Sequence, residues 1–303
     1  SDYDFGPVRE HNLAGKMLGL TGEFFGNRRA WDAMRALDYL ASRTDVDAER
    51  LGVTGASGGG TLSSYLFALD DRLKAAAPAC YITTFARNFA NELPTDSEQI
   101  PPGLWAAGGE MADFLIARAP APALILAVEN DFFDPRGAVE SFDELSRIHR
   151  LLGHPDGAGL FTGPGGHALG PELRRAACRF FAAQFLGNKD ATMPEFPAWP
   201  EEELRVTPSG QVADLPGEET VGLYLARRTK ELAAGRKPDA ETIAAFLRTA
   251  LQVTTPVAVP DYRALRGDWQ PPRISRFALA TEPGCEAFLH IPGGTETLFH
   301  LPK

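Results

Sequence analysis

The sequence predicts an α/β fold in which a mostly parallel sheet is flanked by helices. Up to about residue 187, short apolar runs alternate with amphipathic segments, the pattern that crossover helices between parallel strands produce. A glycine-rich turn at 55–60 stands between one apolar run and one helical segment. The 303 residues, 44% of them hydrophobic and 23% charged, suit either two domains or one large α/β domain.

Helices and strands are predicted along the first 187 residues. The first helix is expected at 27–42, where apolar side chains recur on one face, and the residues before it are interpreted as a loop. Short apolar runs predict buried strands at 50–54, 75–81, 123–128 and around 159–161. Amphipathic stretches predict further helices at 62–69, 138–152 and 171–185.

The character of the sequence changes after residue 187. Three prolines in 188–203 indicate a linker, and 204–213 is expected to form a small hairpin. Two helices are predicted at 220–234 and 239–252, and alternating residues over 274–301 predict an antiparallel β-meander. The expected division is therefore a catalytic part at 1–187, a linker at 188–203 and a mixed segment at 204–303.

Charge and composition exclude several functions. Thirty Lys and Arg against forty Asp and Glu give a net charge of −10, which disfavours nucleic-acid binding. The three cysteines have neither the number of a disulfide framework nor metal-ligand spacing, so no metal site is expected. No apolar run approaches the roughly 18 residues of a membrane span, so no membrane partner is expected. The first residue is Ser1 rather than Met, so the absence of a signal peptide says little about the compartment.

The run Gly55-Ala56-Ser57-Gly58-Gly59 has the form of a nucleophile turn. A serine on a sharp strand-to-helix turn needs small neighbours, because the strained backbone crowds the positions two before and two after it. The turn exposes the Ser57 hydroxyl and directs the Gly58 N–H at an oxyanion. A phosphate-binding loop is the alternative, but the Lys-Ser/Thr of a P-loop and the Gly-x-Gly-x-x-Gly spacing are both missing.

A serine nucleophile needs a base and an acid that orients the base. Asp131 follows the strand at 123–128 and is the first choice for the acid. Asp134 is the second choice, although it could instead cap the following helix, and Glu129 is the third. His167, in Gly163-Pro164-Gly165-Gly166-His167, is the candidate base, because the order Ser, Asp, His along successive strand ends matches that of hydrolases.

Two aromatic residues are candidates for substrate binding. Tyr81 follows the strand after Ser57 and could line the pocket, with core packing as the alternative. Trp105 lies in a loop that could cover the pocket. The other histidines, His11 among them, show no spacing that would cluster metal ligands.

Several short motifs lie within 28–81: Trp31-Asp32, Leu37-Asp38-Tyr39-Leu40, Asp47, Gly55-Ala56-Ser57-Gly58-Gly59-Gly60 and Leu69-Asp70-Asp71-Arg72. Two more lie downstream, Asp131-Phe132-Phe133-Asp134 and Gly166-His167. This set resembles the acetyl xylan esterase-like branch of the α/β-hydrolase superfamily, which is related to the prolyl oligopeptidase clan. The resemblance implies an α/β-hydrolase fold and a serine esterase with nucleophile Ser57, acid Asp131, base His167 and oxyanion donor Gly58. It implies a small-molecule or polysaccharide ester as substrate, no metal or organic cofactor, and favours a secreted or periplasmic location. A peptidase of the same clan and a catalytically idle binding protein are the alternatives.

The sequence departs from this family in one respect. In the family, several strands precede the one that carries the serine, whereas here only one predicted helix and a loop do so. The tail at 273–301 resembles the opening antiparallel strands of the same fold. Two hypotheses follow: a second chain, fragment or copy of this chain supplies the early strands, or the chain is a permuted domain whose own tail pairs with the sheet.

Overall fold

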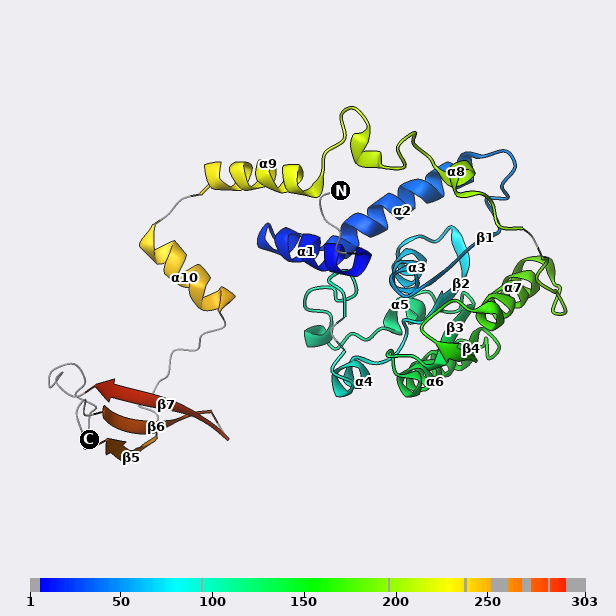
Figure 1. Ribbon diagram of the computed structural model, residues 1–303. Helices are drawn as coiled ribbons and strands as arrows, with labels where there is room; N and C mark the ends of the chain where they lie inside the picture. The colour runs from blue at the N-terminus through cyan, green and yellow to red at the C-terminus, as the bar shows by residue number, and fades with distance from the viewer. Residues whose placement is uncertain are drawn as a thin grey trace. The chain divides into compact units, whose positions relative to one another are not determined.

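The structure is a computed structural model that describes residues 6–93, 95–195, 197–236, 239–251, 261–268, 274–282 and 284–292. Its contacts divide the chain into two compact units, Ser1–Ala234 and Gly235–Lys303 (Figure 1). Within the described residues, each unit contains one sheet. The division falls between Ala234 and Gly235, beyond the linker predicted at 188–203.

The sheet of the first unit has four parallel strands in the order β1 (Leu51–Ala56), β2 (Leu73–Ala79), β3 (Ala123–Asn130) and β4 (Ala158–Gly166). The register joins the three strands β2, β3 and β4 at one level, where Leu126 of β3 lies opposite both Ala79 of β2 and Phe161 of β4. Because all four strands run the same way, their carboxyl ends meet at one edge, where α/β proteins place ligands. The predicted parallel sheet is confirmed.

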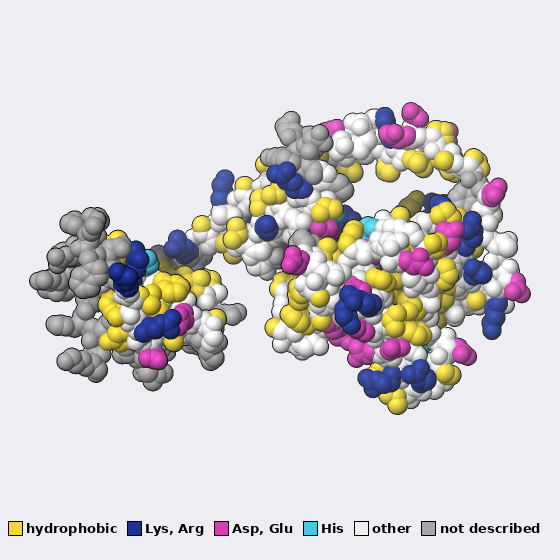
Figure 2. All heavy atoms as spheres, turned by 60° about the horizontal axis from the view of Figure 1, so that its bottom comes forward, with side chains coloured by type: hydrophobic (Ala, Val, Ile, Leu, Met, Phe, Trp, Pro, Cys, Tyr) yellow, Lys and Arg dark blue, Asp and Glu magenta, His cyan; other side chains and the backbone are white. Residues whose placement is uncertain are grey.

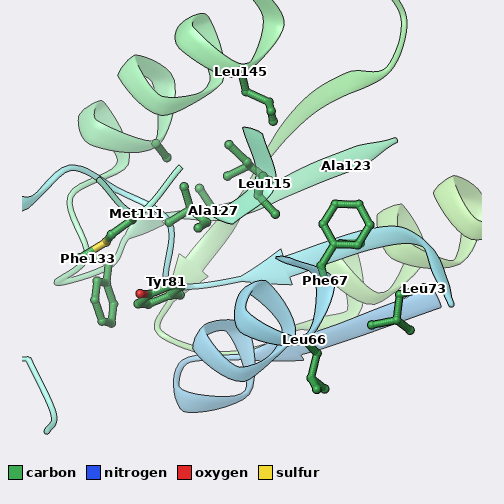
Figure 3. Packing of buried hydrophobic residues seen from close by; sticks show 14 of the residues in the cluster. Leu66, Phe67, Leu73, Tyr81, Met111, Leu115, Ala123, Ala127, Phe133 and Leu145 are labelled. Atoms are coloured by element: carbon green, nitrogen blue, oxygen red, sulfur yellow. The ribbon is translucent and has the colours of Figure 1, made fainter. Parts of the chain in front are cut away.

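Helices cover both faces of this sheet. Alternate side chains of β3 enter two separate hydrophobic clusters, Ile125 and Ala127 in one and Leu126 and Val128 in the other. The first cluster, drawn in Figure 3, also takes residues from α2 (Phe25–Ser42), α3 (Gly58–Leu69), α5 (Asp113–Ile116) and α6 (Pro135–Leu151). The second is closed by α7 (Pro171–Leu186). These two layers hold the strand ends rigidly in place.

One helix lies where the sequence was interpreted as a loop. Helix α1 (Pro7–Leu20) begins at a proline, a favourable first position for a helix, and buries Ala14 and Leu18. It was missed because its buried stripe is short and its outer face carries exposed apolar residues such as Met17. Two smaller helices, α4 (Phe85–Ala90) and the 3₁₀ turn η1 (Trp105–Ala107), lie between β2 and β3.

The predicted hairpin at 204–213 is wrong. The segment contains the end of α8 (Glu201–Leu204), a turn closed by the Gly210 N–H on the Thr207 carbonyl at 3.0 Å, and the 3₁₀ turn η2 (Val212–Asp214). Residues 207–210 therefore form a turn, but the residues on either side of it do not pair as strands. Helix α9 (Val221–Ala234) follows as predicted, and its Tyr224 hydroxyl donates to Glu23 Oε1 at 2.6 Å.

The second unit contains α10 (Ala240–Ala250) and an antiparallel sheet of β5 (Tyr262–Asp268), β6 (Ile274–Glu282) and β7 (Cys285–Pro292). The predicted meander is confirmed over the described residues, with β5 as an additional strand; its end at 293–301 lies outside them. In the described part of the chain the three tail strands pair with one another, and the hypothesis of a permuted domain stays a prediction. The hypothesis that a second chain or copy supplies strands stays a prediction.

The surface carries charge of both signs. On the face of the first unit in view in Figure 2, acidic and basic side chains are intermingled and separated by uncharged areas. Charged side chains of the first unit form ion pairs, such as Arg43–Asp45 at 2.7 Å and Arg50–Asp47 at 2.6 Å. Among the described residues, no helix combines the length and the apolar character that crossing a bilayer requires.

Candidate active site

Ser57 occupies the sharp turn between β1 and α3. Its backbone has φ 58° and ψ −121°, a region that a side-chain-bearing residue rarely adopts. Hydrogen bonds fix the turn on both sides: the Ser57 N–H donates to the Ala79 carbonyl at 3.0 Å, and the Thr61 N–H donates to the Ser57 carbonyl at 2.9 Å. Strain held by such bonds is typical of a functional residue and matches the geometry expected of a nucleophile turn.

The small residues around Ser57 are needed for steric reasons. A Cβ on Gly55 would lie 2.6 Å from the carbonyl oxygen of Gly59, and a Cβ on Gly60 would lie 2.5 Å from the carbonyl oxygen of Ala79. Both obstacles are backbone atoms, which cannot rotate away. A Cβ on Gly59, two positions after Ser57, would meet nothing within 4 Å, so the crowding expected there is wrong and lies one position further along, at Gly60.

The Gly55→Ala substitution should therefore distort the turn and destabilise the fold by about 1–3 kcal/mol. Gly59→Ala is the matched control: it should leave stability unchanged or raise it by up to about 1 kcal/mol, because alanine favours a helix over glycine. Urea unfolding of both variants measures the difference. Equal stabilities of the two variants would contradict the crowding described for Gly55.

Asp131 and His167 form a hydrogen-bonded pair at the carboxyl edge of the sheet. His167 Nδ1 lies 2.8 Å from Asp131 Oδ1, which also accepts the Phe133 N–H at 3.1 Å. The Asp131 side chain is 2% exposed and that of His167 is 23% exposed, with the Phe132 ring 4.1 Å from the imidazole between centroids. The carboxylate thus holds Nδ1, which leaves Nε2 available for proton transfer.

The structure brings the predicted acid and base into contact, and it places the predicted nucleophile at the same edge of the sheet. Ser57 follows β1, Asp131 follows β3 and His167 follows β4. Within the described residues no hydrogen bond joins the Ser57 hydroxyl to His167. Such contacts are often long in ligand-free enzymes and tighten when substrate binds.

The two other acidic candidates have different surroundings. Asp134 caps α6: its Oδ1 accepts the Arg136 N–H at 2.9 Å, and its carboxylate forms an ion pair with the Arg136 side chain. Glu129, at the end of β3, is exposed. Asp134 therefore makes the contacts of a helix cap, whereas Asp131 is the acid that contacts His167.

The Arg136 guanidinium, bonded to the nearly buried Asp134 carboxyl, holds the pKa of that carboxyl below its usual value. A depressed pKa stabilises the fold above the unfolded value of about 3.9, and the stabilisation disappears as pH falls through the folded value. Asp134→Asn keeps the capping oxygen but loses the charge, so it should cost about 1 kcal/mol at pH 7 and progressively less below about pH 4. Unfolding titrations at several pH values check this, and a cost that does not change with pH would contradict it.

The predicted oxyanion donor, Gly58, begins α3, so its N–H lies in the first turn at the positive end of the helix. Beside it the structure brings together two residues that sequence reasoning did not connect. His11 Nδ1 lies 2.7 Å from Glu98 Oε1, and that oxygen would lie 3.6 Å from a Cβ on Gly58. These three residues line one small cavity. Because His11 and Glu98 are 87 positions apart, no local pattern could have paired them.

The two predicted substrate residues differ in position. Tyr81 is 1% exposed and packs in the core beside Phe133 (Figure 3), the arrangement that its core-packing alternative expects. Trp105 is 52% exposed and lies against Phe89, with ring centroids 4.8 Å apart. Trp105 therefore remains a candidate for binding substrate at the surface.

The described residues contain one group of side chains with the types and spacing of metal ligands. It consists of Cys80, Asp131 and His167. Two of these residues belong to the predicted triad, and Cys80 directly follows β2, the strand between β1 and β3.

The chain is similar to a protein family, to a bacterial relative and to solved structures. The model of the Prolyl oligopeptidase family matches residues 24–100. The Bacillus subtilis (strain 168) protein YtaP, which carries the name of a hydrolase, is 27% identical over 176 residues, 54% of this chain and 56% of that protein. Among solved structures, Methylesterase BT1017 is similar with a TM-score of 0.51 at 24% identity, over 69% of this chain and 48% of that one. A glucuronoyl esterase from Solibacter usitatus has a TM-score of 0.43 at 21% identity, over 52% and 47%. The chain spans about half the length of these relatives, with 56%, 48% and 47% of each covered.

Proposed function

Since the chain has the α/β-hydrolase fold, we propose that it is a serine hydrolase that cleaves a carboxylic ester. The single observation that carries the proposal is the hydrogen bond of 2.8 Å between His167 Nδ1 and a buried Asp131 carboxylate, at the sheet edge that also presents the strained Ser57. An imidazole oriented in this way is poised to accept a proton on Nε2.

In the proposed reaction, Ser57 Oγ attacks the ester carbonyl while His167 Nε2 accepts the hydroxyl proton. Asp131 keeps the Nδ1 proton in place and stabilises the imidazolium. The Gly58 N–H, at the N-terminus of α3, donates to the oxyanion. His167 then returns its proton to the departing alcohol, and water hydrolyses the acyl-enzyme by the same steps in reverse order.

The acyl group is proposed to be of acetyl type and the alcohol to belong to a carbohydrate. The acetyl type rests on the resemblance of the motifs around Ser57 to acetyl xylan esterases; one similar solved structure is named a methylesterase, an enzyme of esters with a small alkyl part. Exposed aromatic rings support a carbohydrate, because a flat aromatic face packs on the C–H face of a sugar ring. Phe89 and Trp105 present such faces, and the Asn91 side chain joins the end of α4 to the Phe132 carbonyl beside Asp131 at 3.4 Å.

Replacement of Trp105 by alanine should raise the KM for acetylated xylan about 3- to 10-fold, the loss of one aromatic contact of about 0.5–1.5 kcal/mol. Hydrolysis of p-nitrophenyl acetate should change much less, because this substrate has no sugar ring to pack on the indole. Trp199, 67% exposed and outside the α4 region, provides the control Trp199→Ala. A KM for xylan that Trp105→Ala leaves unchanged would remove Trp105 from the substrate site.

A peptidase is the second candidate, favoured by the match to the prolyl oligopeptidase model over 24–100. Parallel assays on p-nitrophenyl acetate, acetylated xylan and proline-containing peptide anilides distinguish the two. The proposal expects turnover of the esters and little of the anilides, and preferred cleavage of the anilides would overturn it. A folded protein that hydrolyses none of these substrates would favour the idle binding protein.

A further inference from the structure

Cys80 lies with the proposed acid and base at the carboxyl edge of the sheet. It directly follows β2, as Asp131 follows β3 and His167 follows β4. One ligand atom from each of the three side chains lies within 4.8 Å of the other two. Thiol, carboxylate and imidazole are the three side-chain types that coordinate zinc in proteins.

The carboxylate has an unused oxygen at this place. Asp131 Oδ1 accepts from His167 and from the Phe133 N–H, whereas Asp131 Oδ2 is buried without a hydrogen-bond partner in the described part of the chain. A buried carboxylate oxygen without a donor costs free energy, which a bound cation would recover. The Cys80 thiol is 2% exposed, and its Sγ lies 3.6 Å from the Ala168 carbonyl, beside His167.

We propose that Cys80, Asp131 and His167 bind one divalent transition-metal ion, with Zn²⁺ as the ion of best fit, and that its binding inhibits the hydrolase. The inhibition rests on the proposed function; the binding does not. A thiolate and a carboxylate together neutralise the charge of the ion, which suits a poorly hydrated site. Zinc bonds of 2.0–2.3 Å in a tetrahedron separate the ligand atoms by about 3.3–3.8 Å, so ligands within 4.8 Å need to move by about 1 Å.

The ion would inhibit the hydrolase because it changes which nitrogen of His167 carries the proton. A coordinated metal displaces the Cys80 thiol proton to solvent. The metal would also take His167 Nδ1, the nitrogen that faces Asp131. The imidazole proton then resides on Nε2, and an Nε2–H cannot accept the proton of Ser57. The 23% exposure of His167 offers a route from solvent to the site.

The test uses the full chain with Co²⁺ and Zn²⁺ as probes. Cobalt bound to a thiolate gives a charge-transfer absorption, which reports Cys80 without reference to catalysis. The expected result is one Zn²⁺ bound per chain by calorimetry, the thiolate–cobalt absorption, and ester hydrolysis that Zn²⁺ inhibits and EDTA restores. Cys80→Ser should remove the absorption and weaken Zn²⁺ binding tenfold or more, in keeping with the sensitivity of metal sites to altered ligands.

The other two cysteines give a matched control, because Cys178 is half-buried on α7 and Cys285 is exposed in the second unit. The double variant Cys178→Ser/Cys285→Ser should bind both ions as the wild type does. A thiolate–cobalt absorption that survives in Cys80→Ser, or no Zn²⁺ bound to the wild type, would overturn the site. Metal binding in a chain without esterase activity would instead overturn the proposed function and leave the site intact.

Discussion

Replacing Ser57 with alanine is expected to lower kcat/KM for p-nitrophenyl acetate by about 10⁴- to 10⁶-fold. The reason is that Ser57 alone supplies the attacking oxygen at the turn between β1 and α3, so its loss removes the acyl-enzyme route altogether. The fold should survive, because the bonds that hold the turn come from the backbone: the Ser57 N–H to Ala79 and the Ser57 carbonyl to Thr61. Alanine retains both.

Ser63 provides the control for this substitution. It lies on α3, the helix that follows Ser57, where its hydroxyl donates to the Gly59 carbonyl at 2.7 Å. A hydroxyl that bonds back to its own helix contributes little to stability, so Ser63→Ala should keep activity within a few-fold of the wild type. Thermal unfolding of both variants establishes that they are folded. Activity of Ser57→Ala within tenfold of the wild type would rule out Ser57 as the nucleophile.

Replacing Asp131 with asparagine is expected to lower kcat about 10⁴-fold with little change in KM. An amide NH₂ facing His167 Nδ1 would donate where the carboxylate accepts, so the imidazole would carry its proton on Nε2 and lose its function as a base. The effect should be large because the Asp131 side chain is 2% exposed and lies 2.8 Å from Nδ1. Kinetics at saturating ester concentration measure it.

The neighbouring acid serves as the comparison. Asp134→Asn changes a cap of α6 three residues away, so it should alter stability while kcat stays within a few-fold of the wild type. If Asp134→Asn impaired kcat as severely as Asp131→Asn, the orienting acid would not be Asp131. The two variants thus separate the acid that contacts His167 from the acid that caps a helix.

The sequence predicted the parts of the fold that depend on local pattern. The apolar runs now seen in β1 to β4 are short and bounded by turns, and their spacing required crossover helices, so the parallel sheet followed. The crowding around Ser57 was predicted correctly at Gly55, whose Cβ would meet the Gly59 carbonyl, but the second crowded position is Gly60 rather than Gly59. Asp131 and His167 could be chosen because each follows a predicted strand.

Features that depend on contacts distant in the sequence could not be predicted. The pairing of His11 with Glu98 spans 87 residues and involves a helix whose buried stripe, Ala14 and Leu18, is too short to produce a clear period. Tyr81 was ambiguous because a residue just after a strand can face either the core or the site. Packing against Phe133, with centroids 6.0 Å apart, decides for the core.

The segment at 204–213 illustrates another limit. Its turn residues were identified correctly, since Gly210 has φ 77° and closes a turn on Thr207. However, a turn becomes a hairpin only when its flanks pair, and alternation over so few residues does not determine pairing. The tail alternates over a longer stretch, and its strands β6 and β7 do pair.

The most direct test of the account is a fluorophosphonate probe, which reacts with an activated serine and with few unactivated ones. The wild-type chain is treated with the probe, digested, and the modified peptide is sequenced by tandem mass spectrometry, with His167→Ala as the comparison. The account predicts a single adduct on Ser57 that forms quickly in the wild type and at least about 100-fold more slowly in His167→Ala. An adduct on another residue, no adduct in folded wild-type protein, or equal rates in the two proteins would contradict it.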